Sequence, residues 1–288
     1  MDSLKKHCPA RPEEGLAGKV LEFEVLKRFP LVAHGVFNRN GGVSAPPFDS
    51  LNVGLNCGDE PDRVAENRNR IIRHLGGGRP VFLSQVHGDR IAVIKSRGIF
   101  LGSGDQQPPL SKHLPEPDGR GPRNGLVADG VITDVPGLLL VIQVADCQSV
   151  MLFDPRRRVI ANIHSGWRGS ISDINGQAVA VMVREFNCDP RDIRAGISPS
   201  LGPCCAEFIH YETEIPRHLW HYMNPGHRFD FWGMSRDQLL GKGLRQENIH
   251  ISGICTRCCP EKFYSYRHEH VTGRFASVIG LMEPKETP

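Results

Sequence analysis

The chain has 288 residues, and 35 Lys and Arg against 32 Asp and Glu give a net charge of +3 with neutral histidines. This near balance excludes the broad basic surface of a typical nucleic-acid-binding protein, so no nucleic-acid partner is expected. No apolar run approaches the ~18 residues of a membrane span. Residues 1–9 lack the apolar core of a signal peptide. We therefore expect a cytoplasmic protein with no membrane partner.

The amino-terminal half is predicted to contain strands, one helix and a long insertion. Short apolar runs closed by turn residues predict strands, and apolar residues every three or four positions predict a helix. In chain order these are a loose polar leader (residues 1–18), strands (21–36), a glycine-rich turn (38–44), a helix (60–76), a strand (81–86) and an insertion (102–125). The insertion contains five prolines and is predicted to be a surface loop within the domain.

The carboxy-terminal half is predicted to mix strands and helices. The predicted strands are residues 131–133, 138–144, 150–153, 159–163, 193–197, 249–254 and 275–281. The predicted helices are residues 172–186, 204–222 and 231–242. The run 138–144 is almost continuously apolar, which is typical of a strand buried on both faces. The intermixing without a regular βαβ rhythm predicts an α+β fold with mixed β-sheets packed together and flanking helices.

Length alone favours about two domains. We predict a single compact domain over residues 19–283, because the candidate functional residues extend through the whole middle of the chain. Three apolar runs there end in a side chain that can bind a metal, at His87, Cys147 and His164. The ends of central strands are common places for sites in proteins that mix helices and strands.

Two imidazoles and one thiolate form a sound ligand set for zinc. Three protein ligands leave a fourth position for water or substrate, as in catalytic zinc sites. The sequence intervals between these residues match no ligand spacing of a zinc finger. Each residue alone could instead be a buried strand-end side chain whose hydrogen bonds are made to backbone groups. A metal-free alternative makes Cys147 a thiolate nucleophile, with His87 or His164 as its base and Asp146 orienting the pair.

Four arginines lie among glycines and turns near these strand ends: Arg39, Arg168, Arg267 and Arg274. Guanidinium groups suit the bidentate binding of phosphate or carboxylate. The alternative for each is a solvated surface residue. Their setting predicts an anion site at the same end of the sheets.

The chain has nine cysteines, and an odd number cannot all pair in disulfides within one chain. A reducing compartment also favours free thiols over disulfides. A four-thiolate zinc site could take two residues from Cys204-Cys205 and two from the group Cys255, Cys258 and Cys259. We rank it below reduced thiols, because a Cys-Cys dipeptide does not match the usual ligand spacing. Cys8, Cys57 and Cys188 have no motif context and receive no role.

Several motifs together resemble a known family, the laccase-domain or YfiH-type proteins. They are Ser84-Gln85-Val86-His87-Gly88, Ala128-Asp129-Gly130, Ala145-Asp146-Cys147, His164-Ser165-Gly166-Trp167-Arg168-Gly169, Gly202-Pro203-Cys204-Cys205 and Phe263-Tyr264-Ser265-Tyr266-Arg267. The resemblance extends over roughly residues 20–281. The family was first labelled multicopper polyphenol oxidase and is now understood as zinc-dependent purine nucleoside phosphorylases with adenosine deaminase side activity.

The resemblance implies that zinc is bound by His87, Cys147 and His164. It implies that phosphate attacks C1′ of adenosine, inosine or 5′-methylthioadenosine and releases the base and a ribose 1-phosphate. Arg39, with Arg168 or Arg267, would bind the phosphate. The expected partners are therefore purine nucleosides and phosphate, and the sequence does not indicate an oligomeric state.

The chain departs from the family pattern at a few positions. Ser149 stands where a proline is usual, His268 and His270 replace an arginine and a glycine, and Ser235 stands where an asparagine is common. These departures affect expected substrate contacts more than the metal ligands.

Two other enzyme classes and a non-enzymatic metal-binding module remain as alternatives. A copper-dependent polyphenol oxidase would use paired His-x-His ligands, and the single such pair is His268-x-His270. A metal-free cysteine hydrolase would stay active after chelation.

Overall fold

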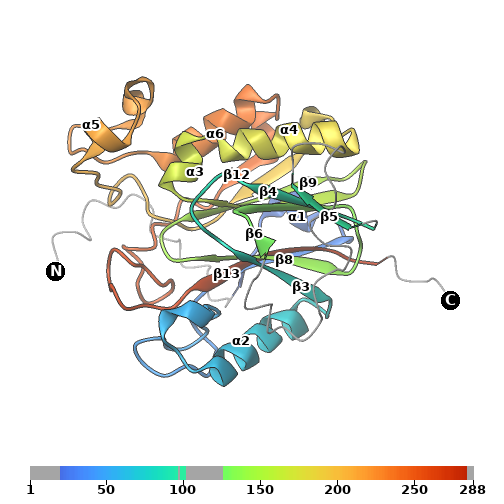
Figure 1. Ribbon diagram of the computed structural model, residues 1–288, viewed down its shortest axis with the longest axis horizontal. Coiled ribbons are helices and arrows are strands. Elements are labelled where there is room, and N and C mark those ends of the chain that lie inside the picture. The colour runs from blue at the N-terminus through green and yellow to red at the C-terminus, as the bar shows by residue number, and fades with distance from the viewer. Residues whose placement is uncertain (1–19, 97, 102–125, 284–288) are drawn as a thin grey trace.

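Two β-sheets lie face to face at the centre of the computed structural model (Figure 1), which describes residues 20–96, 98–101 and 126–283. The six-stranded sheet has the order β1 (Val20–Leu21), β2 (Val32–Phe37), β13 (Phe275–Leu281), β8 (Leu138–Val144), β3 (Arg79–Ser84) and β6 (Leu126–Val127). The seven-stranded sheet has the order β12 (Ile249–Ile251), β11 (Arg194–Ile197), β9 (Gln148–Asp154), β10 (Val159–Ser165), β7 (Gly130–Thr133), β4 (Ile91–Lys95) and β5 (Gly98–Leu101).

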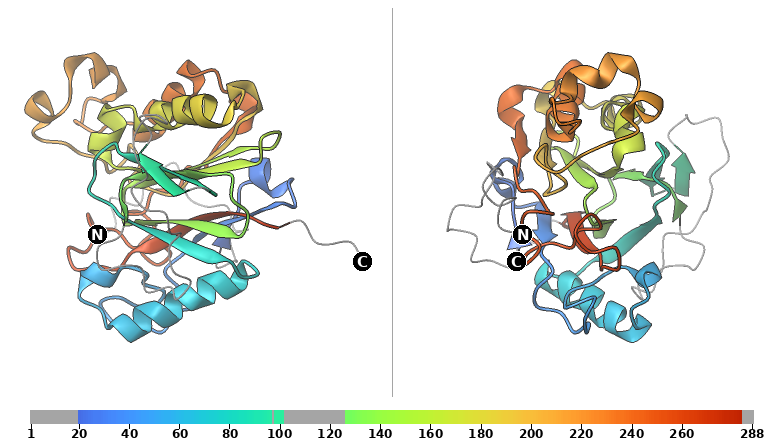
Figure 2. Two further views of the ribbon diagram at one scale, coloured as in Figure 1. Left: turned by 45° about the vertical axis from the view of Figure 1, so that its right-hand side comes forward. Right: turned by 90° about the vertical axis from the view of Figure 1, so that its left-hand side faces the viewer.

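Helices cover the outer faces of both sheets. Helix α2 (Pro61–His74) lies on the six-stranded sheet, and α4 (Ile174–Phe186) and α6 (Phe231–Gly241) lie on the seven-stranded sheet. Both views of Figure 2 show α2 below the sheets and α4 and α6 above them. The remaining helical segments are short: α1 (Glu24–Lys27), η2 (Leu55–Cys57), α3 (Trp167–Ile171), η3 (Pro190–Asp192), α5 (Tyr211–Glu214), η4 (Arg217–Tyr222) and η5 (Gln246–Asn248).

Strand β8 shows why its sequence is almost continuously apolar. Leu138, Leu140 and Ile142 point into the core between the sheets. Leu139 and Val141 point the other way and pack in the cluster that includes residues of α2. Successive side chains of a strand face opposite sides, so a strand between two apolar layers has no polar face.

A buried polar network also joins the two sheets. The side-chain amide of Asn162 on β10 donates to the carbonyl oxygens of Leu140 and Ser277, each at 2.9 Å. Ser149 on β9 donates to Asn162 Oδ1 or Ser277 Oγ, at 2.6 and 2.7 Å. Ser149 thus uses its hydroxyl to connect the sheets, at the position where the family pattern has proline.

The α+β class, the mixed sheets and the single compact unit are confirmed. Strand pairs β3–β8, β4–β7 and β11–β12 are parallel, and the other pairs are mostly antiparallel. The helix that ends at Phe186 was predicted to be capped by Ser172 or Asp173, and Asp173 is the cap: its carboxylate accepts a hydrogen bond from the Gly176 N–H, and the helix begins at Ile174. The predicted leader and the 102–125 insertion lie outside the described residues.

Two secondary-structure predictions are wrong. Residues 204–222 were predicted to be helical with an interruption at Pro216, but they form only the short α5 and η4, one on each side of Pro216, because the aromatic residues of this segment pack around Phe229 in irregular chain. Residues 21–36 are interrupted by α1, and β4 and β5 were not predicted. No helix in the described part is long and apolar enough to cross a bilayer.

Candidate functional site

The three predicted metal ligands meet where the chain passes between the two sheets. His87 lies between β3 of the six-stranded sheet and β4 of the seven-stranded sheet. Cys147 lies between β8 and β9, which also belong to different sheets, and His164 lies near the end of β10. Their ligating atoms all lie within 4.8 Å of one another. The structure thus places together the three residues that lie at the predicted strand ends.

Strand pleating and side-chain pairing explain how two of these elements reach the site. Ile160, Asn162 and His164 alternate along β10, and the first two face the space between the sheets, so His164 faces it too. Just beyond the end of β3, the side chain of Gln85 continues the pairing of that strand with β8. The Gln85 amide donates to the Gln143 carbonyl, and its oxygen accepts from the Gln143 N–H, both at 2.9 Å.

Two residues of the site have left-handed backbone conformations. His87 has φ of 59° and Asp146 has φ of 88°. Such a conformation costs a non-glycine residue roughly 1–3 kcal/mol, so the surrounding contacts must hold it. The Asp146 carboxylate accepts hydrogen bonds from the Thr256 hydroxyl and from the Arg267 N–H, both at 2.7 Å.

Asp129 organises both histidines, a role that sequence reasoning missed. Its carboxylate lies 2.8 Å from His164 Nδ1 and accepts the N–H groups of His87 and Gly88 at 2.9 and 2.8 Å. Its backbone carbonyl accepts the His164 N–H. Asp129 is fully buried. The orienting carboxylate is therefore Asp129 and not Asp146, which is engaged by Thr256 and Arg267. The only signal in the sequence was the Ala-Asp-Gly motif itself.

The charges of the site are strongly coupled. Burial raises the pKa of the Cys147 thiol, but the charge and hydrogen bond of His164 and the hydrogen bond of His87 outweigh it and lower that pKa to about 6. Burial lowers the pKa of His164, but the Cys147 thiolate and Asp129 raise it to about 9. Burial raises the pKa of Asp129, and the hydrogen bonds from His164, Gly88 and His87 bring it below its ordinary value. The protein thus stabilises a thiolate at neutral pH.

The residues present fit a bound metal ion. The contact of His164 Nδ1 with Asp129 leaves Nε2 for a metal, an arrangement common among metal-binding histidines. Gly166 keeps the space beside the three ligands open. A Cβ atom there would lie 3.2 Å from His87 Cδ2, 3.3 Å from Cys147 Sγ and 3.7 Å from His164 Cε1.

A cleft of about 1560 Å³ opens over these ligands. It is larger than the roughly 300–1,000 Å³ of common small-molecule pockets. Cationic and aromatic side chains line it: Arg168, Arg267, Arg274, Trp167, Phe208 and Tyr266. The Arg168 guanidinium lies over the Trp167 ring, 4.2 Å from its centroid. Arg267 donates to the Glu207 carbonyl at 2.9 Å and connects two walls of the cleft.

Arg39 does not join this group. The residues that line the cleft do not include it. Its guanidinium is largely buried and donates to the carbonyl oxygens of Asp49 and Pro260, at 2.8 and 2.9 Å. It also lies 4.6 Å from the centroid of the Tyr264 ring. This geometry gives Arg39 a packing role and does not support its predicted contact with phosphate.

Comparison with known proteins decides the family. Residues 33–282 match the family model described as multi-copper polyphenol oxidoreductase laccase. The chain belongs to this family. It is 31% identical over 264 residues to a protein of Geobacillus stearothermophilus named purine nucleoside phosphorylase YlmD, covering 86% of this chain and 90% of that one. It is 32% identical over 256 residues to the Escherichia coli K12 protein named purine nucleoside phosphorylase YfiH, covering 85% and 91%.

Solved structures of the family have the same fold. The crystal structure of the Bacillus licheniformis hypothetical protein YfiH aligns with a TM-score of 0.77 at 29% identity, covering 92% of this chain and 97% of that one. The crystal structure of YlmD from Geobacillus stearothermophilus aligns with a TM-score of 0.75 at 27% identity, covering 93% and 97%.

Proposed function

We propose that this chain is a zinc-dependent purine nucleoside phosphorylase. The observation that carries the proposal is the His87–Cys147–His164 trio beneath a cleft lined by arginines and aromatic rings. The names of its relatives in Geobacillus stearothermophilus and Escherichia coli support the same activity. The substrates proposed are adenosine, inosine and 5′-methylthioadenosine, and the deamination of adenosine is proposed as a side activity.

In the proposed reaction a phosphate oxygen forms a bond to C1′ of the ribose as the bond from C1′ to the purine nitrogen breaks. The purine leaves with the electron pair and takes up a proton, and ribose 1-phosphate remains. The transition state combines an anionic nucleophile with a positively charged sugar. The guanidinium groups of Arg168 and Arg267 would hold the phosphate from the exposed side of the cleft.

The purine would lie against the aromatic side chains that line the cleft, Trp167, Phe208 and Tyr266. These rings offer flat apolar surfaces, and two of them already stack with arginines of the site. A metal held by His87, Cys147 and His164 would supply Lewis-acid polarisation and, for deamination, an activated water. Asp129 keeps the His164 ring in the orientation that this binding needs.

The description of the matched family instead suggests copper chemistry on phenols. Among the described residues two groups of metal-binding side chains come together, and neither includes His268 or His270. The single His-x-His pair that the copper alternative needs is therefore not assembled into such a group. A single trio containing one thiolate suits the zinc proposal better.

A metal-free cysteine nucleophile is the second candidate, and one observation favours it. Cys147 has a pKa of about 6 beside a cationic His164, as in enzymes with a thiolate–imidazolium pair. Full activity of chelator-treated protein, shown to be metal-free by elemental analysis, would favour this mechanism over the zinc mechanism.

The product test separates the remaining functions. The protein is incubated with adenosine, with and without inorganic phosphate, and the products are identified by chromatography and mass spectrometry. We expect adenine and ribose 1-phosphate only when phosphate is present, together with slow formation of inosine. A parallel assay with phenolic substrates and copper tests the oxidase alternative. No turnover of any purine nucleoside would overturn the proposal.

A further inference from the structure

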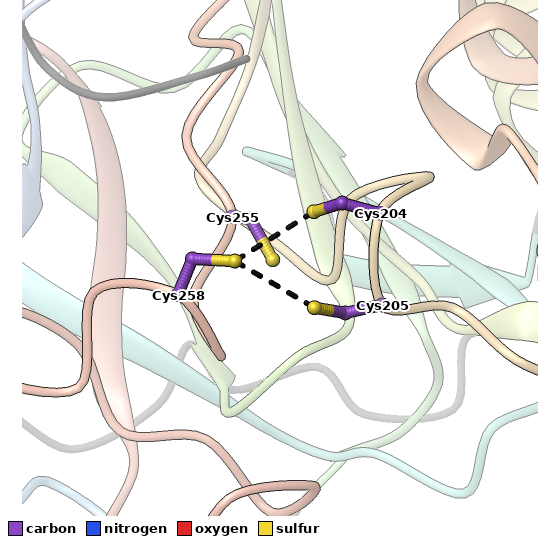
Figure 3. Close-up of side chains that lie close together, drawn as sticks. All are labelled: Cys204, Cys205, Cys255 and Cys258. Carbon is purple, nitrogen blue, oxygen red and sulfur yellow. Dashed lines mark hydrogen bonds between the residues drawn. The ribbon is translucent and has the colours of Figure 1, made fainter. Parts of the chain in front are cut away.

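A second cluster of sulfur ligands lies outside the cleft trio. The Sγ atoms of Cys204, Cys205, Cys255 and Cys258 lie within 4.8 Å of one another. Figure 3 shows the four side chains pointing toward a common centre from two loops that are distant in the sequence. One loop follows β11 and the other follows β12, the parallel neighbours at the edge of the seven-stranded sheet.

The sulfur separations are those of a metal site. Cys258 Sγ lies 3.7 Å from Cys204 Sγ and 3.6 Å from Cys205 Sγ. A tetrahedral site with Zn–S bonds of ~2.3 Å separates neighbouring sulfurs by about 3.8 Å. A disulfide would need ~2.05 Å between sulfurs. All eight cysteines of the described part are thiols.

The local backbone explains how a Cys-Cys dipeptide can supply two ligands. The turn after Gly202 brings the N–H groups of Cys205 and Ala206 to the Gly202 carbonyl at 2.8 and 2.9 Å. This tight turn directs both adjacent sulfurs into the cluster. From the sequence we ranked a four-thiolate site below reduced thiols on ligand spacing alone, and this turn shows how adjacent cysteines can both face one centre. The second pair, Cys255-x-x-Cys258, has the spacing usual for a zinc knuckle.

The surroundings favour a closed, structural site. Cys205 and Cys255 are buried, and Cys204 and Cys258 are half-buried. The cluster packs within the apolar group that also contains Phe208 and Phe231. Four protein sulfurs complete a tetrahedral shell and leave no position for substrate. A divalent cation among the four sulfurs would favour the loss of their protons and would hold the two loops together.

The cluster connects directly to the cleft trio. Thr256, next to Cys255, donates its hydroxyl to Asp146, the neighbour of Cys147. Leu201, close to Cys204, donates its N–H to the Asp146 carbonyl at 2.8 Å. The same two loops carry Phe208 and Arg267 into the cleft. Fixing the loops therefore also fixes one wall of the cleft.

The geometry points to a second, structural zinc ion held by the thiolates of Cys204, Cys205, Cys255 and Cys258. It clamps the loop after β11 to the loop after β12. The cleft trio is itself proposed to bind zinc, so the test removes that trio first.

The test begins with full-length Cys147→Ala protein, dialysed against a weak chelator and analysed for metals. We expect about one zinc to remain per chain, and replacement by Co²⁺ to give the intense thiolate-to-cobalt absorption of tetrahedral sulfur coordination. Absence of retained metal together with absence of that absorption contradicts the inference. Stoichiometric iron in place of zinc, or a disulfide among the four cysteines, also contradicts it.

The second step adds Cys205→Ser to the Cys147→Ala protein, with Cys188→Ala added instead as the matched control. Cys188 is buried in the core beneath α4, away from the cluster. We expect Cys205→Ser to abolish the retained zinc and to lower the Tm, whereas Cys188→Ala keeps the zinc. Equal zinc retention in both variants contradicts the inference. Should Cys205→Ser fail to fold, the cobalt spectrum of the Cys147→Ala protein decides the question.

Discussion

The carboxylate of Asp129 accepts a hydrogen bond from Nδ1 of His164 across 2.8 Å in the fully buried layer beneath the cleft. The same carboxylate holds the backbone of the left-handed residue His87. One side chain thus orients one histidine of the trio through its ring and the other through its main chain. This double contact explains how ligands from three different chain segments keep a common geometry.

Replacing Asp129 with Asn should weaken metal binding. Asparagine keeps one acceptor oxygen, and its NH₂ group cannot accept the N–H groups of His164, His87 or Gly88 that the second carboxylate oxygen helps to accept now. Loss of such a partner typically lowers metal affinity about 10- to 100-fold. The measurement is zinc affinity by chelator competition. Asp134→Asn, at an exposed position, is the control that should leave affinity unchanged. Equal affinities in the two variants would refute the role assigned to Asp129.

A methyl group at Gly166 should interfere with the ligand trio but not with the fold. Gly166 has φ of −74°, which alanine adopts without strain. Its Cβ would lie 3.2 to 3.7 Å from an atom of each ligand. We expect Gly166→Ala to lose zinc and activity while its Tm stays within a few degrees of the parent.

The matched control for Gly166 is Gly241→Ala. Gly241 is the last residue of α6, and a Cβ there meets nothing within 4 Å. The Gly241→Ala variant should retain zinc. Its free energy of unfolding should rise by about 0.4–1 kcal/mol, because alanine restricts the conformations of the unfolded chain. Normal zinc content in Gly166→Ala would show that the space beside Gly166 is not needed.

Arg168→Gln tests the proposed anion site. Arg168 is exposed in the cleft and stacks on Trp167, so its loss should not destabilise the core. A hydrogen bond to a charged group contributes about 1.5–3 kcal/mol. We therefore expect the KM for phosphate to rise about 10- to 100-fold, with little change in the KM for adenosine. Arg191→Gln, an exposed arginine paired with Asp189, should change neither value. An unchanged KM for phosphate would remove Arg168 from the anion site.

Stability should depend on pH through His34. Burial lowers the pKa of His34 to about 4, and its Nε2 accepts the Phe23 N–H at 2.8 Å. The unfolded chain binds a proton near the ordinary pKa of 6.5, whereas the folded protein resists it until about pH 4. The stabilisation is complete above pH 6.5 and falls by about 3 kcal/mol as the pH drops to 4.

The check is the free energy of unfolding by denaturant, measured from pH 7 to pH 4 for the parent and for His34→Gln. Glutamine can still accept the Phe23 N–H but does not titrate. The free energy of unfolding of the parent, relative to that of His34→Gln, should fall by about 3 kcal/mol over this range. Parallel pH profiles would show that His34 does not contribute to acid sensitivity.

The grouping of His87, Cys147 and His164 could be predicted because each lies at the end of an apolar strand, and these strand ends converge in the fold. The run that forms β8 predicted a strand between two apolar layers for the same reason. Asp129 could not be assigned a role from the sequence. Its function depends on three hydrogen bonds to residues that are distant along the chain and meet only in the folded protein.

Arg39 and Cys204-Cys205 show the limits of local context. Arg39 lies in a glycine-rich loop that resembles an anion site, but its guanidinium donates to the carbonyl oxygens of nearby Asp49 and of Pro260, which is distant in the sequence. The Cys-Cys dipeptide violates the usual spacing of metal ligands, but a tight turn brings both sulfurs together. In both cases the outcome depends on loop conformation, which side-chain patterns do not specify.

The central claim is that His87, Cys147 and His164 form the metal centre of a phosphorylase. The most direct measurement compares zinc content and ribose 1-phosphate formation from adenosine and phosphate in the parent and in Cys147→Ala. We expect the variant to lose both the zinc of the cleft and the turnover, while circular dichroism shows an intact fold. Unchanged zinc content with unchanged phosphorolysis in Cys147→Ala would contradict it.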